Sequence, residues 1–155
     1  MTRIKPLKKE EARQETKESL EGIEKQFGMI PNLFATIAHY PKALKPIVAL
    51  YQVLAKESTI EPKLQEFANL EVSRINRCHY CLAHHTQMAK MAGVKDEQLK
   101  SWEMGKLEGI FSDKEKVVIN YARQVTKDAE NVSDELFKSL SSYFTESEIV
   151  NLTLI

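Results

Sequence analysis

The stretch PKLQEFANLEVSRINRCHYCLAHHTQMAKMA, residues 62 to 92, decides the fold of this chain. Pro62 suits the first position of a helix, because the N–H that proline lacks would have no partner there. Apolar residues then recur at helical spacing, which predicts a helix over residues 62–75 with a buried stripe of Leu64, Phe67, Ala68, Val72 and Ile75. The pattern breaks at residues 76–77, and a second helix is expected over residues 78–92, ended by Gly93. The stretch therefore predicts an antiparallel helix hairpin.

The rest of the chain also repeats its apolar residues at helical spacing. Residues 1–27 are a charged N-terminal lead-in, helical from about residue 8, and a wide buried face is expected over residues 43–54. Shorter helices are expected over residues 33–38, 96–102, 113–127 and 134–143, and a last one after Thr145. Ser112 with Glu115 has the spacing of a capping box. Five glycines and five prolines are too few for a β-rich fold, so we predict one all-α domain over residues 1–155.

Charge and hydropathy exclude several classes of protein. Lys plus Arg and Asp plus Glu each number 22, so the chain lacks the basic excess of a nucleic-acid binder. No apolar run approaches the roughly 18 residues of a membrane span, and MTRIKPLKKEEARQE at the N-terminus is too charged for a signal peptide. We therefore expect a cytoplasmic protein with neither nucleic-acid nor membrane partners. The apolar end IVNLTLI is expected to dock in a homo-oligomer or to continue into a further helix.

The two cysteines of the chain open the second hairpin helix, and a histidine follows one turn later. At about 100° per residue, Cys78, Cys81 and His85 point within about 60° of one another. Helical side chains three apart have Cβ atoms about 5–6 Å apart, so a small adjustment reaches the roughly 3.5–4.5 Å of a disulfide. The helix start also favours a thiolate, and lowering a thiol pKa of about 8.5 by about two units makes the thiolate dominant at pH 7. In a reducing cytosol, such a pair predicts redox chemistry or metal binding.

Two carboxylates compete to be the partner of His85. Glu66 lies about as far before the turn as His85 lies after it, so an antiparallel hairpin brings the two side chains face to face. Glu71 lies within the apolar stripe, and a helical wheel would choose it as the buried carboxylate. We favour Glu66, because the position opposite Glu71 is Leu82, and Glu66 can face His85 if the helix is buried on two sides. A carboxylate there would orient the imidazole and take up its proton.

Other interpretations of the same residues compete with redox catalysis. Two cysteines with His84 or His85 could form a tetrahedral zinc site, although His84 points off the shared face. The cysteines could also be inert packing. His79 and His84 are expected at the surface, and Tyr80 either lines a pocket or packs in the core. Core packing is expected for Trp102, Phe34, Met88 and Met91.

The hairpin resembles the active-site hairpin of the alkylhydroperoxidase D-like branch of the carboxymuconolactone decarboxylase family. That family's pattern is Glu, eleven residues, Cys, two residues, Cys, three residues, His, and here it is met by Glu66, Cys78, Cys81 and His85. The position before the second cysteine is His or Tyr in the family, and here it is Tyr80. GMIPNLFATIAHYP, residues 28 to 41, also resembles the lead-in of peroxidase-related members, so the likeness spans roughly residues 28–125.

The resemblance implies an all-helical homo-oligomer, with a hexamer favoured over a trimer, that reduces hydroperoxides through thiol chemistry. In the family the second cysteine, here Cys81, attacks the peroxide, and the first, here Cys78, resolves the sulfenic acid to a disulfide. Glu66 and His85 would relay protons beside Tyr80. An external dithiol would reduce the disulfide, and no cofactor is implied. The alternatives are a redox or sensor protein with little peroxidase turnover, a zinc-binding module, and a decarboxylase, although the decarboxylase branch lacks this cysteine pair.

Overall fold

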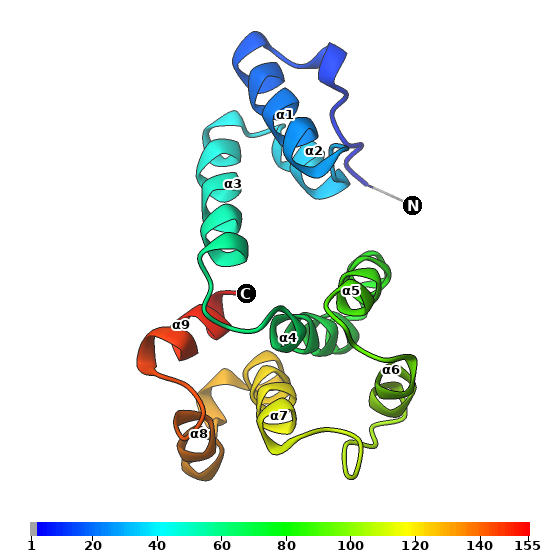
Figure 1. Cartoon of the computed structure of the whole chain (residues 1–155). Coiled ribbons are helices and arrows are strands. Elements are labelled where there is room, and N and C mark those ends of the chain that lie inside the picture. Colours follow the sequence, from blue (N-terminus) through cyan, green and yellow to red (C-terminus); the bar gives the residue numbers. More distant parts are fainter. Residues whose placement is uncertain (1–2) are drawn as a thin grey trace. The chain divides into compact units, whose positions relative to one another are not determined.

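The computed structural model describes residues 3–155, with the side chains of residues 55 and 56 excepted, and all regular structure in that range is helical (Figure 1). The all-α prediction is therefore confirmed. No helix among these residues is long and apolar enough to cross a membrane. The elements are η1 (Lys9–Glu11), α1 (Gln14–Phe27), α2 (Asn32–Ile37), α3 (Pro41–Lys56), α4 (Pro62–Ile75), α5 (His79–Met91), α6 (Asp96–Glu103), α7 (Asp113–Lys127), η2 (Ala129–Asn131), α8 (Asp134–Ser141) and α9 (Glu146–Leu154).

The chain forms two compact units, the first ending at Glu57 and the second running from Ser58 to Ile155. The single domain expected from the sequence stays a prediction. In the N-terminal unit, α1, α2 and α3 pack around a small apolar core of Leu20, Ile23, Phe34, Ala38 and Leu44. The expected helix from residue 8 is wrong in its start, because α1 begins at Gln14. The buried positions of α1 begin at Thr16, and within residues 8–13 the one apolar side chain, Ala12, is half-buried against the core, too little to stabilise a longer helix.

The expected wide buried face over residues 43–54 is also wrong. Leu44 is 1% exposed, whereas Leu50, Tyr51 and Val53 are between 46% and 48% exposed. The residues of the expected face do lie on one helix, because α3 runs from Pro41 to Lys56 with Pro46 inside its first two turns. Within the N-terminal unit α3 packs against α1 and α2, and these contacts leave Leu50, Tyr51 and Val53 uncovered.

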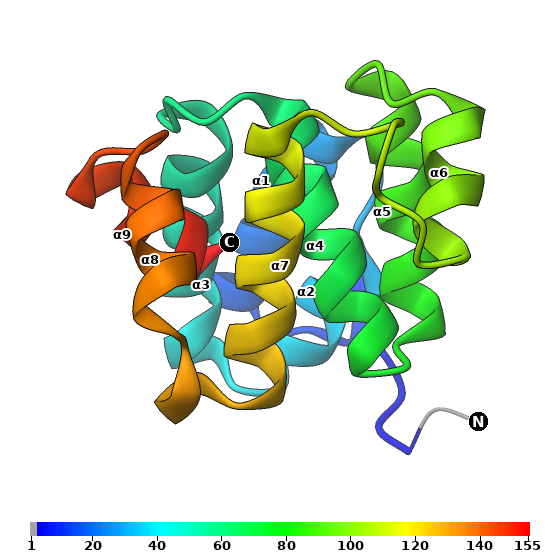
Figure 2. The same cartoon turned by 90° about the horizontal axis from the view of Figure 1, so that it is seen from below.

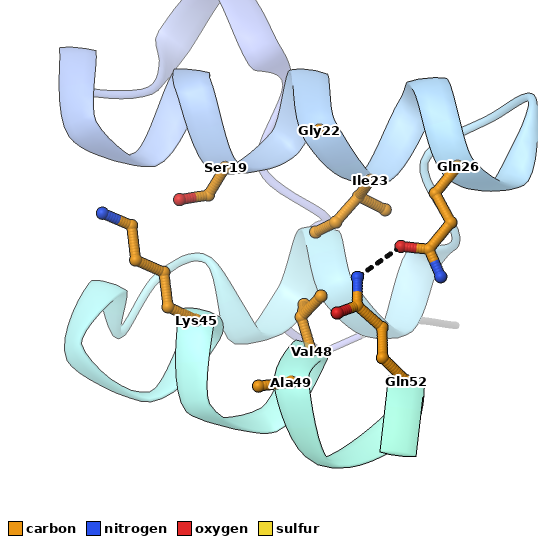
Figure 3. A pocket seen from close by; sticks show the side chains of 8 residues that line it. All are labelled: Ser19, Gly22, Ile23, Gln26, Lys45, Val48, Ala49 and Gln52. Atoms are coloured by element: carbon orange, nitrogen blue, oxygen red, sulfur yellow. Dashed lines mark hydrogen bonds between the residues drawn. The ribbon is translucent and has the colours of Figure 1, made fainter. Parts of the chain in front are cut away.

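A shallow groove runs between α1 and α3 (Figure 3). Its volume is about 290 Å³, and Ile23 and Val48 form its apolar floor. At one end the amide of Gln52 donates a hydrogen bond of 2.6 Å to the side-chain oxygen of Gln26. Lys45 is the charged side chain of the lining, and no cysteine, histidine or carboxylate belongs to it. The groove therefore offers mainly packing surface, and its one hydroxyl, on Ser19, donates to the backbone carbonyl of Glu15.

In the C-terminal unit, α4 lies between α5 on one side and α7 on the other (Figures 1 and 2). This arrangement buries α4 around most of its circumference, with Leu64, Phe67 and Leu70 at most 2% exposed. The helix hairpin expected from α4 and α5 is thus confirmed, but the expected buried stripe is wrong at Val72, which is 37% exposed, and it omits the buried Leu70. Because α4 is central, one of its sides packs in the core and another faces α5.

Side-chain caps fix where the helices of the C-terminal unit begin. The capping box expected at α7 is present, because Ser112 Oγ accepts from the Glu115 N–H and Glu115 accepts from the Ser112 N–H. Glu115 also pairs with Lys63 Nζ of α4 at 2.6 Å. Burial raises the pKa of Glu115, but the Lys63 and Ser112 hydrogen bonds outweigh it and hold the pKa below its usual value. The cap therefore ties α7 to α4 as well as starting α7.

The C-terminal helix is half buried. Ile149 and Leu152 pack in the core of the unit, whereas Val150 and Leu154 are 58% and 55% exposed. The docking of this apolar end in an oligomer stays a prediction.

Candidate functional site

The turn between α4 and α5 places the first cysteine. The N–H of Cys78 donates to the carbonyl of Ser73 at 2.9 Å, and the N–H of Arg77 donates to the carbonyl of Arg74 at 3.1 Å. This pair of bonds is a Schellman motif, in which the residue after the helix cap adopts the left-handed conformation. Here that residue is Arg77, with φ 53°, where glycine is usual. The motif ends α4 abruptly and turns the chain so that Cys78 becomes the N-cap of α5.

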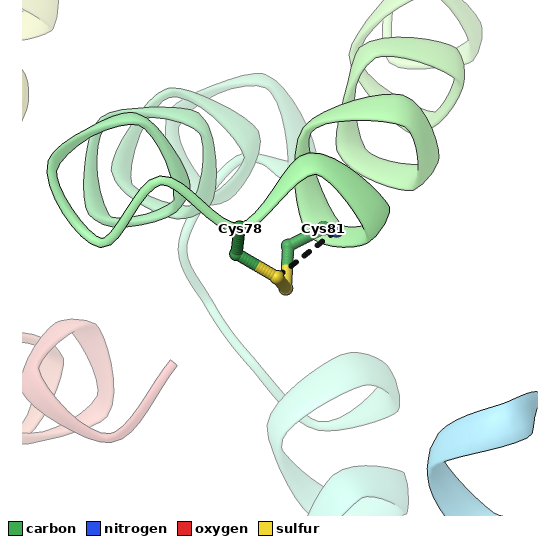
Figure 4. The surroundings of a disulfide bond; sticks show 2 residues. All are labelled: Cys78 and Cys81. Atoms are coloured by element: carbon green, nitrogen blue, oxygen red, sulfur yellow. Dashed lines mark hydrogen bonds between the residues drawn. A yellow bond between two sulfur atoms is a disulfide. The ribbon is translucent and has the colours of Figure 1, made fainter. Parts of the chain in front are cut away.

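Cys78 and Cys81 form a disulfide across the first turn of α5, with their Cα atoms 5.3 Å apart (Figure 4). The bond between these two sulfurs is the one expected from the sequence. The expectation that Cys78 is the first residue of the helix is wrong by one residue, because its ψ of 89° is not helical. Outside the helix, Cys78 can turn its sulfur towards Cys81 without distorting the first turn. The Cys81 N–H points at Cys78 Sγ, 3.2 Å away. The same N–H would stabilise negative charge on Cys78 in the reduced state.

Glu66 of α4 and His85 of α5 meet across the hairpin. His85 Nδ1 lies 2.9 Å from Glu66 Oε2, and the two side chains are 24% and 13% exposed. A carboxylate only accepts hydrogen bonds, so Nδ1 is the donor and Nε2 is left as the proton acceptor of the neutral ring. The contact resolves the conflict over the wheel position of Glu66, because the side of α4 away from the main stripe is covered by α5. His85 lies one helical turn after Cys81, so its ring belongs to the same face as the disulfide.

The remaining residues of the motif lie at the surface. Tyr80 is 51% exposed, so it does not pack in the core. His79 and His84 are exposed, as expected, and the His84 ring meets the His85 ring edge-on with centroids 5.1 Å apart. The expectation that Met88 and Met91 pack in the core is wrong, because they are 38% and 81% exposed. Both follow the apolar spacing of α5, but α5 is covered on the side facing α4 and open on the other.

Glu71, the rival carboxylate, is fully buried and serves a different role. Its two oxygens accept four hydrogen bonds, from Arg74 at 2.6 and 3.2 Å, Arg123 Nε at 2.7 Å and Trp102 Nε1 at 2.8 Å. Burial raises the pKa of Glu71, and the bonds from Arg74, Arg123 and Trp102 outweigh it, so the pKa lies below its usual value. The burial of Glu71 that the helical wheel predicts is confirmed. Its partners show that it joins α4 to α6 and α7 and does not face His85.

Metal binding finds little support in this geometry. Among residues 3–155, no group of three or more His, Cys, Asp or Glu side chains is arranged to hold a metal ion. The sulfurs of Cys78 and Cys81 bond to each other, and His85 Nδ1 is engaged by Glu66. A zinc site would need both sulfurs as separate thiolate ligands and a third and fourth ligand from elsewhere.

The model of the carboxymuconolactone decarboxylase family matches residues 41–124, more than half of the chain. The chain belongs to this family. A curated protein similar to this member of the carboxymuconolactone decarboxylase family is the uncharacterized protein YdfG of Bacillus subtilis strain 168. It is 24% identical over 116 residues, which cover 74% of this chain and 78% of the relative.

Solved structures share the fold of this family member at low sequence identity. The alkylhydroperoxidase AhpD core of an uncharacterized peroxidase-related protein from Ralstonia eutropha JMP134 aligns with a TM-score of 0.80. It is 18% identical over 99% of this chain and 84% of its own. The debrominase Bmp8 aligns with a TM-score of 0.79 at 19% identity, over 99% of this chain and 82% of its own. A protein from Agrobacterium tumefaciens described as a putative antioxidant defence protein AhpD is 24% identical, with a TM-score of 0.66 over 74% of this chain and 78% of its own. The chain thus has the fold of the alkylhydroperoxidase D-like branch.

Sequence reasoning missed two charged residues of this region. Arg123 lies 52 residues after Glu71, and nothing in the local pattern points to their ion pair. The sequence indicates only a helix break at Arg77, and does not show the left-handed backbone that this residue adopts next to Cys78. The residue type at the position after the end of α4 is the signal that could have drawn attention to it, since glycine is expected there.

Proposed function

We propose that this protein is a thiol-dependent peroxidase that reduces hydroperoxides through a Cys78–Cys81 dithiol–disulfide cycle. The observation that supports it best is the hydrogen bond between Glu66 and His85 within one helical turn of a closed cysteine pair. The disulfide supports a redox role for the two cysteines. A base held in one tautomer beside them supplies the proton transfer that peroxide reduction needs.

In the proposed cycle, Cys81 is the attacking thiol. Its proton passes to Nε2 of His85, and the thiolate attacks the terminal oxygen of the peroxide. The O–O bond breaks, the alcohol leaves with one proton, and Cys81 becomes a sulfenic acid. Cys78 then attacks the Cys81 sulfur, water leaves, and the disulfide forms. Two electrons have passed from the dithiol to the peroxide.

The neighbouring groups suit these two roles. Glu66 holds Nδ1 of His85, so the imidazole can take up and return a proton at Nε2 without changing its orientation. The N–H of Cys81 lies 3.2 Å from Cys78 Sγ, which favours a thiolate at Cys78 when the disulfide is open. A thiolate at Cys78 is the species that resolves a sulfenic acid on Cys81.

Two single variants test the roles of the cysteines. After reduction, one equivalent of hydroperoxide should convert two thiols to none in the wild type, as counted by thiol titration. Cys78→Ser should form a sulfenic acid on Cys81 that dimedone traps, whereas Cys81→Ser should consume no peroxide faster than a free thiol does. Peroxide consumption by Cys81→Ser at the wild-type rate would refute the role of Cys81.

The rival interpretations give different results in the same assay. A redox or sensor protein would oxidise stoichiometrically but would not turn over with saturating dithiol reductant. A zinc-binding module would hold close to one metal per chain and would unfold with a chelator. A decarboxylase would retain its activity in both cysteine variants.

A second candidate is reductive dehalogenation, favoured by the alignment with the debrominase Bmp8 over 99% of this chain. Another structure of that protein, a variant with one cysteine replaced by alanine, contains 2,3,4-tribromopyrrole. A dithiol can supply the two electrons that replace a carbon–bromine bond by a carbon–hydrogen bond, with bromide and the disulfide as the other products. Bromide release from tribromopyrrole by the reduced protein, without release of water or alcohol from a peroxide, would support this candidate.

The cycle also implies partners. The proposed oxidising substrate is a hydroperoxide, and the proposed reductant is an external dithiol. Neither nucleic acid nor a membrane has a part in the chemistry, and the residues of the cycle require no bound cofactor. We further propose a homo-oligomer, a hexamer in preference to a trimer.

A further inference from the structure

The residue immediately before the disulfide has an unfavourable backbone for its type. Arg77 has φ 53°, and it is the single residue other than glycine with positive φ among residues 3–155. At the corresponding position of a Schellman motif, glycine adopts this conformation without strain. The Arg77 side chain is exposed, so no core packing compensates for the strain. An arginine that is not favoured by its backbone or its packing points to a function of its guanidinium.

The surroundings of the disulfide leave this positive charge uncompensated. From residue 72 to residue 95 the chain contains no Asp or Glu, although it carries as many acidic as basic residues overall. Arg74 is paired with Glu71 at 2.6 Å, and Lys90 is paired with Asp96 at 2.8 Å. Arg77 makes no ion pair with any carboxylate of residues 58–155.

The two carboxylates closest in sequence to the disulfide are already engaged. Glu66 accepts from His85, and Glu71 is buried among Arg74, Arg123 and Trp102. Neither is available to Arg77 as a partner. An anion that approaches the disulfide from solvent therefore meets an unpaired guanidinium and no exposed carboxylate on the same stretch of chain.

We propose that Arg77 is a specificity residue that selects anionic dithiols as the reductant of the Cys78–Cys81 disulfide. The proposal rests on the dithiol–disulfide cycle of the proposed function and names the charge of its reductant. Adjacent Cα atoms are about 3.8 Å apart, so the Arg77 side chain begins beside the disulfide, and its charge acts on anions within about one Debye length, about 8 Å at physiological ionic strength. Within that range the charge attracts an approaching anion.

The exchange itself is an ordinary two-step reduction. A thiolate of the reductant attacks Cys81 Sγ, the Cys78–Cys81 bond breaks, and Cys78 leaves as a thiolate that the Cys81 N–H stabilises. The second thiol of the reductant then attacks the reductant sulfur that is bonded to Cys81 in the mixed disulfide, and Cys81 is released as a thiol. The reductant ends as a cyclic disulfide, and two electrons and two protons have passed to the protein.

Two small dithiols test the charge preference directly. Dihydrolipoate and dihydrolipoamide share the same pair of thiols and differ in a remote carboxylate or carboxamide. We expect the isolated disulfide form to be reduced about fivefold faster by dihydrolipoate, the factor that corresponds to about 1 kcal/mol for an exposed ion pair in direct contact between its carboxylate and the Arg77 guanidinium. The rate ratio should approach one at about 1 M salt, where the Debye length falls to about 3 Å. Stopped-flow recording of the opening of the disulfide gives both rates.

Three variants separate the charge of Arg77 from its backbone. Arg77→Gly suits the left-handed backbone and removes the charge, so the ratio should fall to about one. Arg77→Lys keeps the charge and should keep most of the preference. Lys138→Gln is the matched control, because it removes one exposed positive charge from α8, which lies on the far side of α7 from α5 (Figures 1 and 2). It should leave the ratio unchanged.

A ratio near one in the wild type, or an unchanged ratio in Arg77→Gly, would overturn the proposal. Because the assay follows disulfide reduction and contains no peroxide, it does not depend on peroxidase turnover. A charge preference without peroxide consumption would leave the role of Arg77 intact and refute the peroxidase. Peroxide turnover with equal reduction rates for the two dithiols would support the peroxidase and refute the role of Arg77.

Discussion

Replacing Glu71 by alanine should destabilise the C-terminal unit more than any surface substitution. The carboxylate is fully buried, and its removal leaves the indole N–H of Trp102, in a residue 3% exposed, without its partner. It also leaves two guanidinium groups, on Arg74 and Arg123, without their acceptor. Removing one partner of a buried ion pair costs about 3–5 kcal/mol. The Arg74 and Arg123 side chains are 40% and 29% exposed and regain some hydration, so we expect about 3 kcal/mol.

Urea unfolding at fixed protein concentration measures this loss. With a slope of about 2 kcal/mol per molar urea, the midpoint should fall by about 1.5 M. Glu108→Ala is a suitable control, because Glu108 pairs with Lys116 at 87% exposure and should cost less than about 0.5 kcal/mol. A double-mutant cycle that combines Glu71→Gln with Arg123→Gln should show a coupling free energy of about 1–3 kcal/mol between the two side chains. A loss below about 1 kcal/mol in Glu71→Ala would refute the idea that this carboxylate holds α4, α6 and α7 together.

Four further predictions concern the two carboxylates, Arg77 and the proposed assembly. Burial raises the pKa of Glu71, but its hydrogen bonds outweigh burial and lower the pKa below 4.5. The stability that Glu71 contributes is therefore full above about pH 4.5 and is lost as the pH falls through the folded-state pKa. The unfolding free energy, measured as a function of pH on the acid side, should decline less in Glu71→Gln than in the wild type. Arg77→Gly should raise the free energy of unfolding by about 0.5–1 kcal/mol, seen as a higher thermal midpoint, since relief of left-handed strain exceeds the entropy cost of glycine. Glu66→Gln should slow peroxide-driven disulfide formation by about 10²-fold, measured by stopped flow, with little change in the thermal midpoint. Light scattering should give a mass six times 17.8 kDa, with three times that mass as the trimer alternative, and a mass of 17.8 kDa would contradict the oligomer.

The parts of the site that the sequence predicted are those that depend on short spacings. Cys78, Cys81 and His85 lie three and four residues apart on one helix, so helix geometry alone places them on one face. The contact of Glu66 with His85 needed only the position of the turn, because residues equally far from a hairpin turn meet. The Ser112–Glu115 cap is likewise local, and it forms as expected.

The parts that the sequence did not predict depend on which elements come together. The apolar residues of α3 have the spacing of a buried face, but exposure depends on how many helices cover them. The expected core packing of Met88 and Met91 is wrong for the same reason, since one side of α5 faces α4 and the other side is open to solvent. The helical wheel identified Glu71 as buried, but its ion pair with Arg123 lies 52 residues away in sequence.

The sequence by itself determined the helical class, the hairpin, and the grouping of two sulfurs with an imidazole, because each follows from a repeat of three or four residues along one helix. Only the tertiary structure decided that Glu71 is held among Arg74, Arg123 and Trp102. It also decided that Arg77 adopts φ 53° beside the disulfide. Local spacing fixes the direction of a side chain relative to its own helix, but burial and partners depend on the surfaces that pack against that helix.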